Sequence, residues 1–152
     1  MQTFATLADF SAHAGQSLGE TDYITITQEM VDLFAQATGD HQWIHTDPER
    51  AARESPYKTA IAHGFLTLSL APKLMAEMYQ VESVKMGVNY GGNKTRFLAP
   101  VRSGKRVRGH FKLLELAEKR PGQWQQTLEF TVEIEGEEKP ALQAEWISQF
   151  FV

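Results

Sequence analysis

The 152-residue chain contains no cysteine. This absence excludes disulfide bonds and thiolate metal sites, and it fits a reducing compartment. The chain also has no apolar run of about 18 residues, so no membrane-spanning helix is expected. The segment Met1–Gly15 has no Lys or Arg ahead of its apolar residues, so no secretory signal is expected. The sequence therefore predicts a cytoplasmic protein without a membrane partner.

Positive charge is also scarce. Fifteen Lys and Arg stand against 19 Asp and Glu, for a net charge of −4. Without a basic surplus to neutralise phosphates, nucleic acid is not expected as the main partner. Hydrophobic residues make up 42% of the chain and charged residues 22%, which is typical of a globular protein. The length suits one domain over residues 1–152.

Two short helices are predicted between residues 27 and 56. One covers residues 28–38, between Thr27 as N-cap and Gly39 as stop. Its expected apolar face consists of Met30, Leu33, Phe34 and Ala37. Asp47-Pro48 is a strong signal for the start of the second helix, which ends near Ser55-Pro56. The segment between the two is not expected to be helical. Before them, a short helix is expected within residues 3–13.

Residues 65–79 predict a long buried helix, because apolar side chains cover almost its whole circumference. Pro72 lies inside it and should kink it. Later in the chain the apolar residues alternate with polar ones, as around Phe130 and Trp146. Alternation of this kind is typical of an antiparallel sheet with one dry face. The sequence thus predicts an α+β fold, an antiparallel sheet wrapped around a central helix. One sheet covers only part of such a helix, so a homodimer is expected.

The candidate chemistry lies in residues 38–48. Asp40 and His45 stand five residues apart beside the apolar Trp43 and Ile44. A carboxylate and an imidazole can supply both halves of general acid–base catalysis, and apolar surroundings shift their pKa values. A second candidate is Gly64, at the mouth of the predicted central helix, where free N–H groups favour a developing anion.

Three ordered blocks resemble the MaoC-like dehydratases, the R-specific enoyl-CoA hydratases. They are the segment from Asp40 to Pro48, the Ala62-His63-Gly64 block, and a block containing Asn89-Tyr90-Gly91, Lys94, Arg96-Phe97 and Pro100-Val101. The Gln42-Trp43-Ile44-His45 version is similar to the nodulation-protein-N branch of that family. The match runs from about residue 22 to about residue 108.

The resemblance implies a hot-dog fold, a dimer, and hydration of a trans-2-enoyl thioester of coenzyme A or acyl carrier protein, without a cofactor. It implies Asp40 and His45 as the catalytic pair and Gly64 as the oxyanion donor. The candidate substrate-binding residues are Trp43, His63, Phe65, Ser69, Asn89, Tyr90 and Arg96. For His63 a structural role, bonding backbone near the helix entry, is favoured. Ser69 is the candidate for a small polar residue on the central helix.

Three alternatives stay open. His41 and His45 have the i, i+4 spacing of a helical metal site, but no helix is expected there and no cysteine is available, so no metal is predicted. A hot-dog thioesterase would use the same carbonyl clamp, and Glu77 is the only acid near the central helix. A non-catalytic acyl-thioester binding module would have no use for an acid–base pair.

Overall fold

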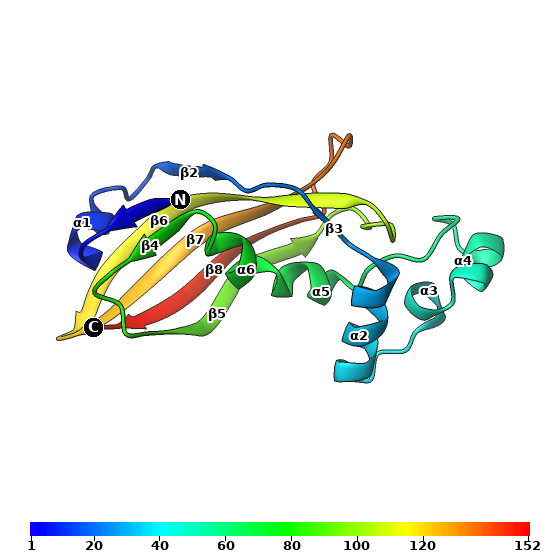
Figure 1. Cartoon of the computed structure of the whole chain (residues 1–152), viewed down its shortest axis with the longest axis horizontal. Helices are drawn as coiled ribbons and strands as arrows, with labels where there is room; N and C mark the ends of the chain where they lie inside the picture. Colours follow the sequence, from blue (N-terminus) through cyan, green and yellow to red (C-terminus); the bar gives the residue numbers. More distant parts are fainter.

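The computed structural model describes residues 1–152 and is built on a six-stranded antiparallel sheet (Figure 1). Its strand order is β2-β6-β7-β8-β5, and β3 also pairs with β6. The strands are β2 (Ser17–Glu20), β3 (Ile24–Thr25), β5 (Met86–Phe97), β6 (Arg106–Arg120), β7 (Gln123–Ile134) and β8 (Leu142–Phe151).

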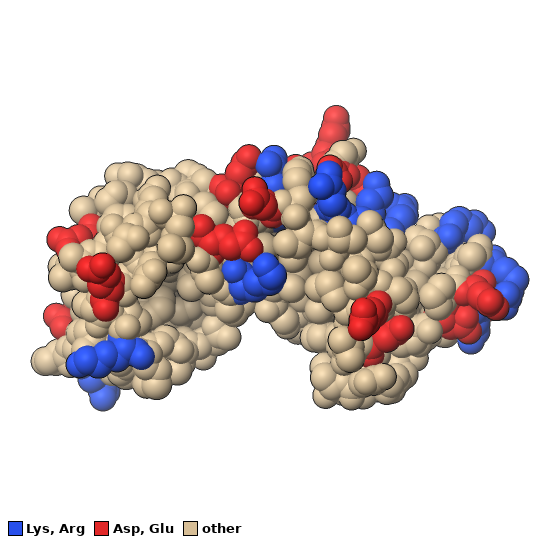
Figure 2. All heavy atoms as spheres, viewed as in Figure 1, with Lys and Arg blue, Asp and Glu red and all other residues tan.

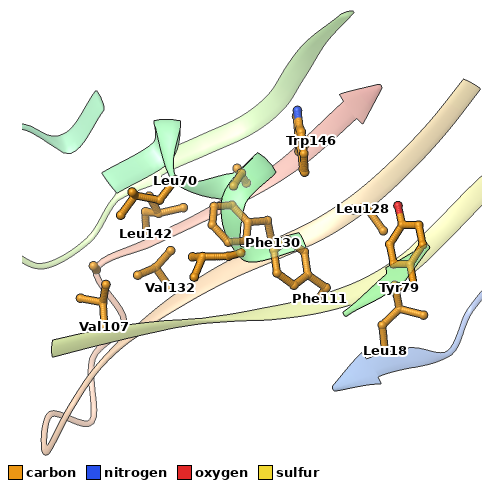
Figure 3. Packing of buried hydrophobic residues seen from close by; sticks show 14 of the residues in the cluster. Leu18, Leu70, Tyr79, Val107, Phe111, Leu128, Phe130, Val132, Leu142 and Trp146 are labelled. Carbon is orange, nitrogen blue, oxygen red and sulfur yellow. The ribbon is translucent and has the colours of Figure 1, made fainter. Parts of the chain in front are cut away.

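The three long central strands follow the predicted alternation. In β7 the buried side chains of Leu128, Phe130 and Val132 alternate with half-exposed polar neighbours, and β8 repeats the pattern. Gly122 and Gly136 lie in the turns after β6 and β7 with φ of +76° and +75°, a conformation that favours glycine. One face of the sheet is therefore apolar and forms the floor of the core (Figure 3).

The central helix is broken, which corrects the prediction of one continuous buried helix. Helix α5 (Gly64–Ser69) ends at Leu70, and α6 (Ala71–Met75) begins there with Pro72 in its first turn. Proline lacks an N–H and fits the first turn of a helix better than its interior, so the chain restarts rather than kinks. The two helices bury Leu66, Leu70 and Leu74 and expose one side, on which Phe65 is 66% exposed. Figure 1 shows both helices lying over the sheet.

Three helices extend beyond the end of the sheet (Figure 1): α2 (Gln28–Thr38), α3 (Trp43–Thr46) and α4 (Pro48–Glu54). The predicted bounds of α2 are confirmed, with the Thr27 side chain accepting from the Met30 N–H and Gly39 left-handed at φ +79°. The predicted apolar face of α2 is half right. Met30 and Phe34 are partly buried against the core, beside the buried Val31 and Ala35. Leu33, at 56% exposed, and Ala37 face away from the rest of the protein. The bounds of α4 agree with the prediction, and Asp47 caps it by accepting from the Arg50 N–H.

The N-terminal segment is less helical than predicted. Helix α1 covers only Leu7–Ser11, after the Thr6–Asp9 capping box, and β1 (Gln2–Phe4) pairs in parallel with β4 (Tyr79–Val81). None of the helices has the length and apolar character needed to cross a bilayer.

Strand β5 is the exposed edge of the sheet. It pairs with β8 on one side only, and eleven of its twelve residues are exposed. Exposed apolar side chains lie along it: Met86, Val88, Tyr90 and Phe97. A long unpaired apolar edge is a ready template for pairing with another strand.

Candidate active site

The loop that follows α2 brings Asp40 to the edge of the site. Gly39 ends the helix, and the Gln42 N–H donates to the Asp40 Oδ1 at 3.4 Å. Residues 43–46 then form a single helical turn, α3, where the sequence predicted no helix. This turn fits between Gly39 and the Asp47 cap of α4, and it points His45 inward.

His45 is 7% exposed, and its ring is fixed by a backbone carbonyl. Its Nδ1 lies 2.6 Å from the Ile61 carbonyl oxygen. Because that oxygen can only accept, Nδ1 carries the proton and Nε2 keeps a lone pair. Burial lowers the pKa of His45 below its usual 6.5; the Ile61 hydrogen bond opposes this, and neighbouring His63 adds to it. His45 is thus neutral near pH 7 and equipped to act as a base.

His63 lies directly against His45. The two rings stack with centroids 3.9 Å apart and planes at 27°. The Nε2 of His63 donates to the Asp40 backbone oxygen at 3.0 Å and lies 4.0 Å from the Asp40 Oδ2. One polar atom of each of Asp40, His45 and His63 lies within 4.8 Å of the others. The predicted catalytic pair is therefore brought together, and His63 makes the backbone contact that was expected of it.

The geometry of this cluster suits proton transfer better than metal binding. An imidazole lone pair lies in the ring plane, so two stacked rings direct their nitrogens side by side rather than toward one ion. The helical His41–His45 pair does not form, because α3 begins at Trp43 and His41 lies outside it, exposed.

A cavity of about 270 Å³ opens beside the cluster. It is lined by His45, Tyr57, Ile61, Ala62, Gly64, Thr67, Phe97, Leu98, Ala99, Pro100, Val101 and Ala141. Most of these side chains are apolar, so a bound acyl group would meet a largely dry wall. Gly64 is the first residue of α5, and no side chain caps this end of the helix. The Gly64 N–H has no hydrogen-bond partner in the chain.

Gly64 is required for space. Its φ is not positive, so backbone conformation does not demand glycine. A Cβ at this position would lie 2.8 Å from Cγ and Cδ1 of Phe97. Real Cβ atoms essentially never approach so closely, so a side chain here would force the Phe97 ring to move. Sequence reasoning did not find this contact, because Phe97 lies at the end of β5, far from Gly64 in the sequence.

Thr67 takes the place that the sequence gave to Ser69. Thr67 lies one turn after Gly64, is 2% exposed and lines the cavity. Ser69 is exposed, and its Oγ donates to the Phe65 carbonyl at 2.6 Å. The i, i+3 spacing from Gly64 was the available signal, since residues three apart share a helix face. Tyr57 carried no comparable signal and also lines the cavity.

The remaining substrate-binding candidates lie outside this cavity. Trp43 packs under the Arg50 guanidinium, 4.3 Å from its ring centroid. Phe65 meets the Phe97 ring edge-on at 5.3 Å. Asn89 and Ser69 line a second cavity of about 390 Å³ between the central helices and strands β5 and β8, and Asn89 accepts from Trp146 Nε1.

Tyr90 and Arg96 lie exposed on β5. Tyr90 is 64% exposed, and the Arg96 guanidinium donates only to the neighbouring Thr95 carbonyl. Some other cations of the chain are paired, such as Arg106 with Glu135 and Arg108 with Glu20 and Glu133. On the face in Figure 2, Lys and Arg lie interspersed with Asp and Glu instead of forming one basic surface.

The comparisons with known proteins agree with this geometry. The model of the MaoC-like domain family matches residues 9–137. The chain belongs to the MaoC-like family. It is 53% identical over 150 residues to 3-hydroxyacyl-thioester dehydratase Z of Mycobacterium tuberculosis, covering 99% of each chain. It is 49% identical to nodulation protein N of Rhizobium leguminosarum bv. viciae, covering 94% of this chain and 89% of the relative.

Among solved structures, an (R)-hydratase from A. caviae matches with a TM-score of 0.71 and 25% identity, covering 89% of this chain and 94% of that one. The predicted α+β hot-dog class is therefore confirmed, as is the family that the three sequence blocks resembled.

Proposed function

We propose that this MaoC-like protein is a hydro-lyase that adds water to a trans-2-enoyl thioester, or removes it from the 3-hydroxyacyl thioester. The observation that carries the proposal is the buried His45, held with its Nε2 lone pair free beside the Asp40 carboxylate and an apolar cavity. The dehydratase and (R)-hydratase named above support the same reaction and the R configuration of the product.

Hydration divides the proton transfers between the two residues. His45 Nε2 takes a proton from water as the water oxygen bonds to the β-carbon. The same proton then passes, with the help of Asp40, to the α-carbon, so one water is consumed and both residues end in the protonation states in which they began. A positioned acid or base typically contributes about 10² to 10⁴ in rate.

The Gly64 N–H serves as the donor to the thioester oxygen. It has no partner within the chain and lies at the cavity wall, where a carbonyl entering beside Phe97 can accept its hydrogen bond. Negative charge develops on that oxygen as the β-carbon is attacked. Loss of one such donor typically costs about 10² to 10³ in rate.

The substrate is a thioester of coenzyme A or of acyl carrier protein. The apolar cavity takes the acyl group, and Arg96 is available to a phosphate because its guanidinium has no carboxylate partner. A guanidinium binds phosphate oxygens through several N–H groups at once.

The working unit is a homodimer formed along β5. The exposed side of α5 and α6 mixes the polar Ser69 and Lys73 with the apolar Phe65 and Pro72, so a helix apolar all round is only part of the argument. The unpaired edge of β5 supports the dimer more directly. The β5 strand of a second protomer would pair the free backbone groups of this edge and cover Val88 and Tyr90.

The decisive experiment follows the enoyl absorbance of crotonyl-CoA. Wild-type protein should remove the band, while Asp40→Asn and His45→Gln should remain folded and lose most of this activity. The two losses should be far from additive, since both residues act on one water. A wild-type protein that leaves the band unchanged would reject the hydro-lyase.

The same assay separates the alternatives. Release of free thiol from the substrate would identify a thioesterase. If the enoyl band stays and no thiol is released, the remaining alternative is a binding module. Glu77, the acid considered for a thioesterase, lies beyond α6 and pairs with Lys73 at 3.0 Å. It is not among the residues of the cavity.

A further inference from the structure

We propose that His63 is a positioning residue of this site, which aligns the Asp40 loop and the His45 ring with each other through two separate contacts. The inference rests on the proposed hydration, and it assigns to His63 a role beyond bonding the backbone near the helix entry.

The first contact holds the Asp40 loop. The His63 Nε2–H donates to the Asp40 backbone oxygen at 3.0 Å. Asp40 itself is exposed and follows the left-handed Gly39, so few other groups restrain it. The His63 hydrogen bond thus sets where the Asp40 carboxylate stands.

The second contact fixes the plane of the His45 ring. The His63 ring stacks on the His45 ring with centroids 3.9 Å apart. The ring of Phe34, on α2, packs against the His63 ring with centroids 4.9 Å apart. The Ile61 carbonyl holds only one end of the His45 ring, at Nδ1. Stacking restrains rotation about that hydrogen bond and so fixes the direction of the Nε2 lone pair.

The protonation pattern of His63 agrees with this role. Donation from Nε2 leaves a lone pair on Nδ1, which is buried without any partner. Buried polar atoms are nearly always paired, and exceptions call for an explanation. The explanation here is that the rest of the ring is in use: Nε2 holds the Asp40 loop, and the ring face packs on His45.

Two variants remove one contact each. His63→Phe keeps a stacked ring and loses the N–H donor, and His63→Gln keeps an N–H donor and loses the ring. The loss of a hydrogen bond in His63→Phe is offset by removal of the unpaired Nδ1, so melting should change little. Displacement of a catalytic group by about 1 Å can cost about 10²-fold in rate. We therefore expect kcat to fall by about tenfold to 10²-fold in both variants, with KM little changed.

His13→Phe is a matched control. His13 also buries an unpaired Nδ1 and packs against Phe4 and Phe10, but it lies outside the candidate site. Its replacement should leave kcat unchanged. A normal kcat in either His63 variant overturns the proposal, because each variant removes one of the two contacts on which it rests. A loss of kcat matched by His13→Phe also overturns it.

The pH behaviour gives a readout that is independent of turnover. Apart from Asp40, the titratable group against the His45 ring is His63, with Tyr57 at the cavity wall. In His63→Gln the stacked ring no longer shields His45 from water, so the pKa of His45, followed by NMR of its ring, should rise. An unchanged titration overturns the proposal. This measurement stands even if the wild type leaves crotonyl-CoA unchanged, an outcome that would reject the hydro-lyase instead.

Discussion

Gly64→Ala should lower turnover through the Phe97 ring while changing stability little. Alanine keeps the N–H that is assigned to the thioester oxygen, so any loss of rate must come from the added methyl group. That Cβ would lie 2.8 Å from two atoms of the ring, and ordinary contact begins at 3.4 Å. The ring must therefore retreat by about 0.6 Å or more, enough to cost up to about 10²-fold in rate if it shifts the substrate.

The stability effects nearly cancel. Forcing extra volume into a packed site costs about 1–3 kcal/mol. Phe97 is 45% exposed and can move toward solvent, so the lower value applies. Because the Gly64 φ is not positive, alanine adds no backbone strain and regains about 0.5–1 kcal/mol of helix propensity. The net change is within about 1 kcal/mol, or about 2–4 °C in Tm.

The assay combines melting with crotonyl-CoA hydration for Gly64→Ala, Phe97→Ala and the double variant. If the methyl group acts through the ring, Gly64→Ala should cost little in the Phe97→Ala background. Gly109→Ala is the control for overpacking: its Cβ would lie 3.0 Å from Phe111 and 3.2 Å from Leu74, in the closed core. It should melt much earlier than wild type yet hydrate normally while folded.

Two results would refute this reasoning. Normal turnover in Gly64→Ala would show that the close packing of Phe97 on Gly64 has no part in catalysis. An equal loss in both Phe97 backgrounds would show that the methyl group acts on the substrate directly, without the ring.

Three further predictions concern the base, the phosphate contact and the dimer. Because burial first of all lowers the pKa of His45, kcat/KM should rise with pH through an apparent pKa below 6.5. An apparent pKa at or above 6.5 would contradict a buried base. Protonating this buried ring disfavours the folded state, so the stability from His45 is present above pH 6.5 and is lost as pH falls through its lowered pKa. Arg96→Gln should raise KM for crotonyl-CoA with little change in kcat, and it should leave KM for crotonyl-pantetheine unchanged. The control Lys112→Gln, on β6, should change KM for neither substrate. An equal rise in KM for both substrates in Arg96→Gln would contradict a phosphate contact. Val88→Asp, in the middle of the β5 edge, should shift the protein from dimer to monomer in sedimentation, and a wild type that is monomeric at all concentrations would reject the dimer.

Local signals predicted the segments whose structure depends on nearby residues. Thr27 and Gly39 bound α2 as expected, and Asp47-Pro48 starts α4, because caps and turn residues act within one helical turn. The alternation in β7 and β8 gave the dry face of the sheet, since one face packs on the core throughout.

Segments that depend on distant contacts were not predicted. Strand β5 has exposed side chains on both faces, so no alternation marks it, and only pairing with β8 makes it a strand. Of the predicted apolar face of α2, Leu33 and Ala37 are exposed, because which side of a helix is buried depends on the neighbouring structure. The continuous central helix failed at Leu70 and Pro72, where composition alone did not separate a kink from a restart.

The candidate site shows the same division. The Asp40–His45 spacing indicated the chemistry, but not the geometry that makes it possible. The proposed base, His45, depends on the Ile61 carbonyl, which fixes the tautomer, and on burial, which keeps the ring neutral. The proposed acid, Asp40, is exposed and is held through a backbone hydrogen bond from His63. Because these restraints are present before any substrate enters, the protein need not reorganise its polar groups when charge develops on the thioester. The proposed role of His63 gives its unpaired buried nitrogen a physical reason: the cost falls on one ring atom, and the gain is the alignment of Asp40 with His45.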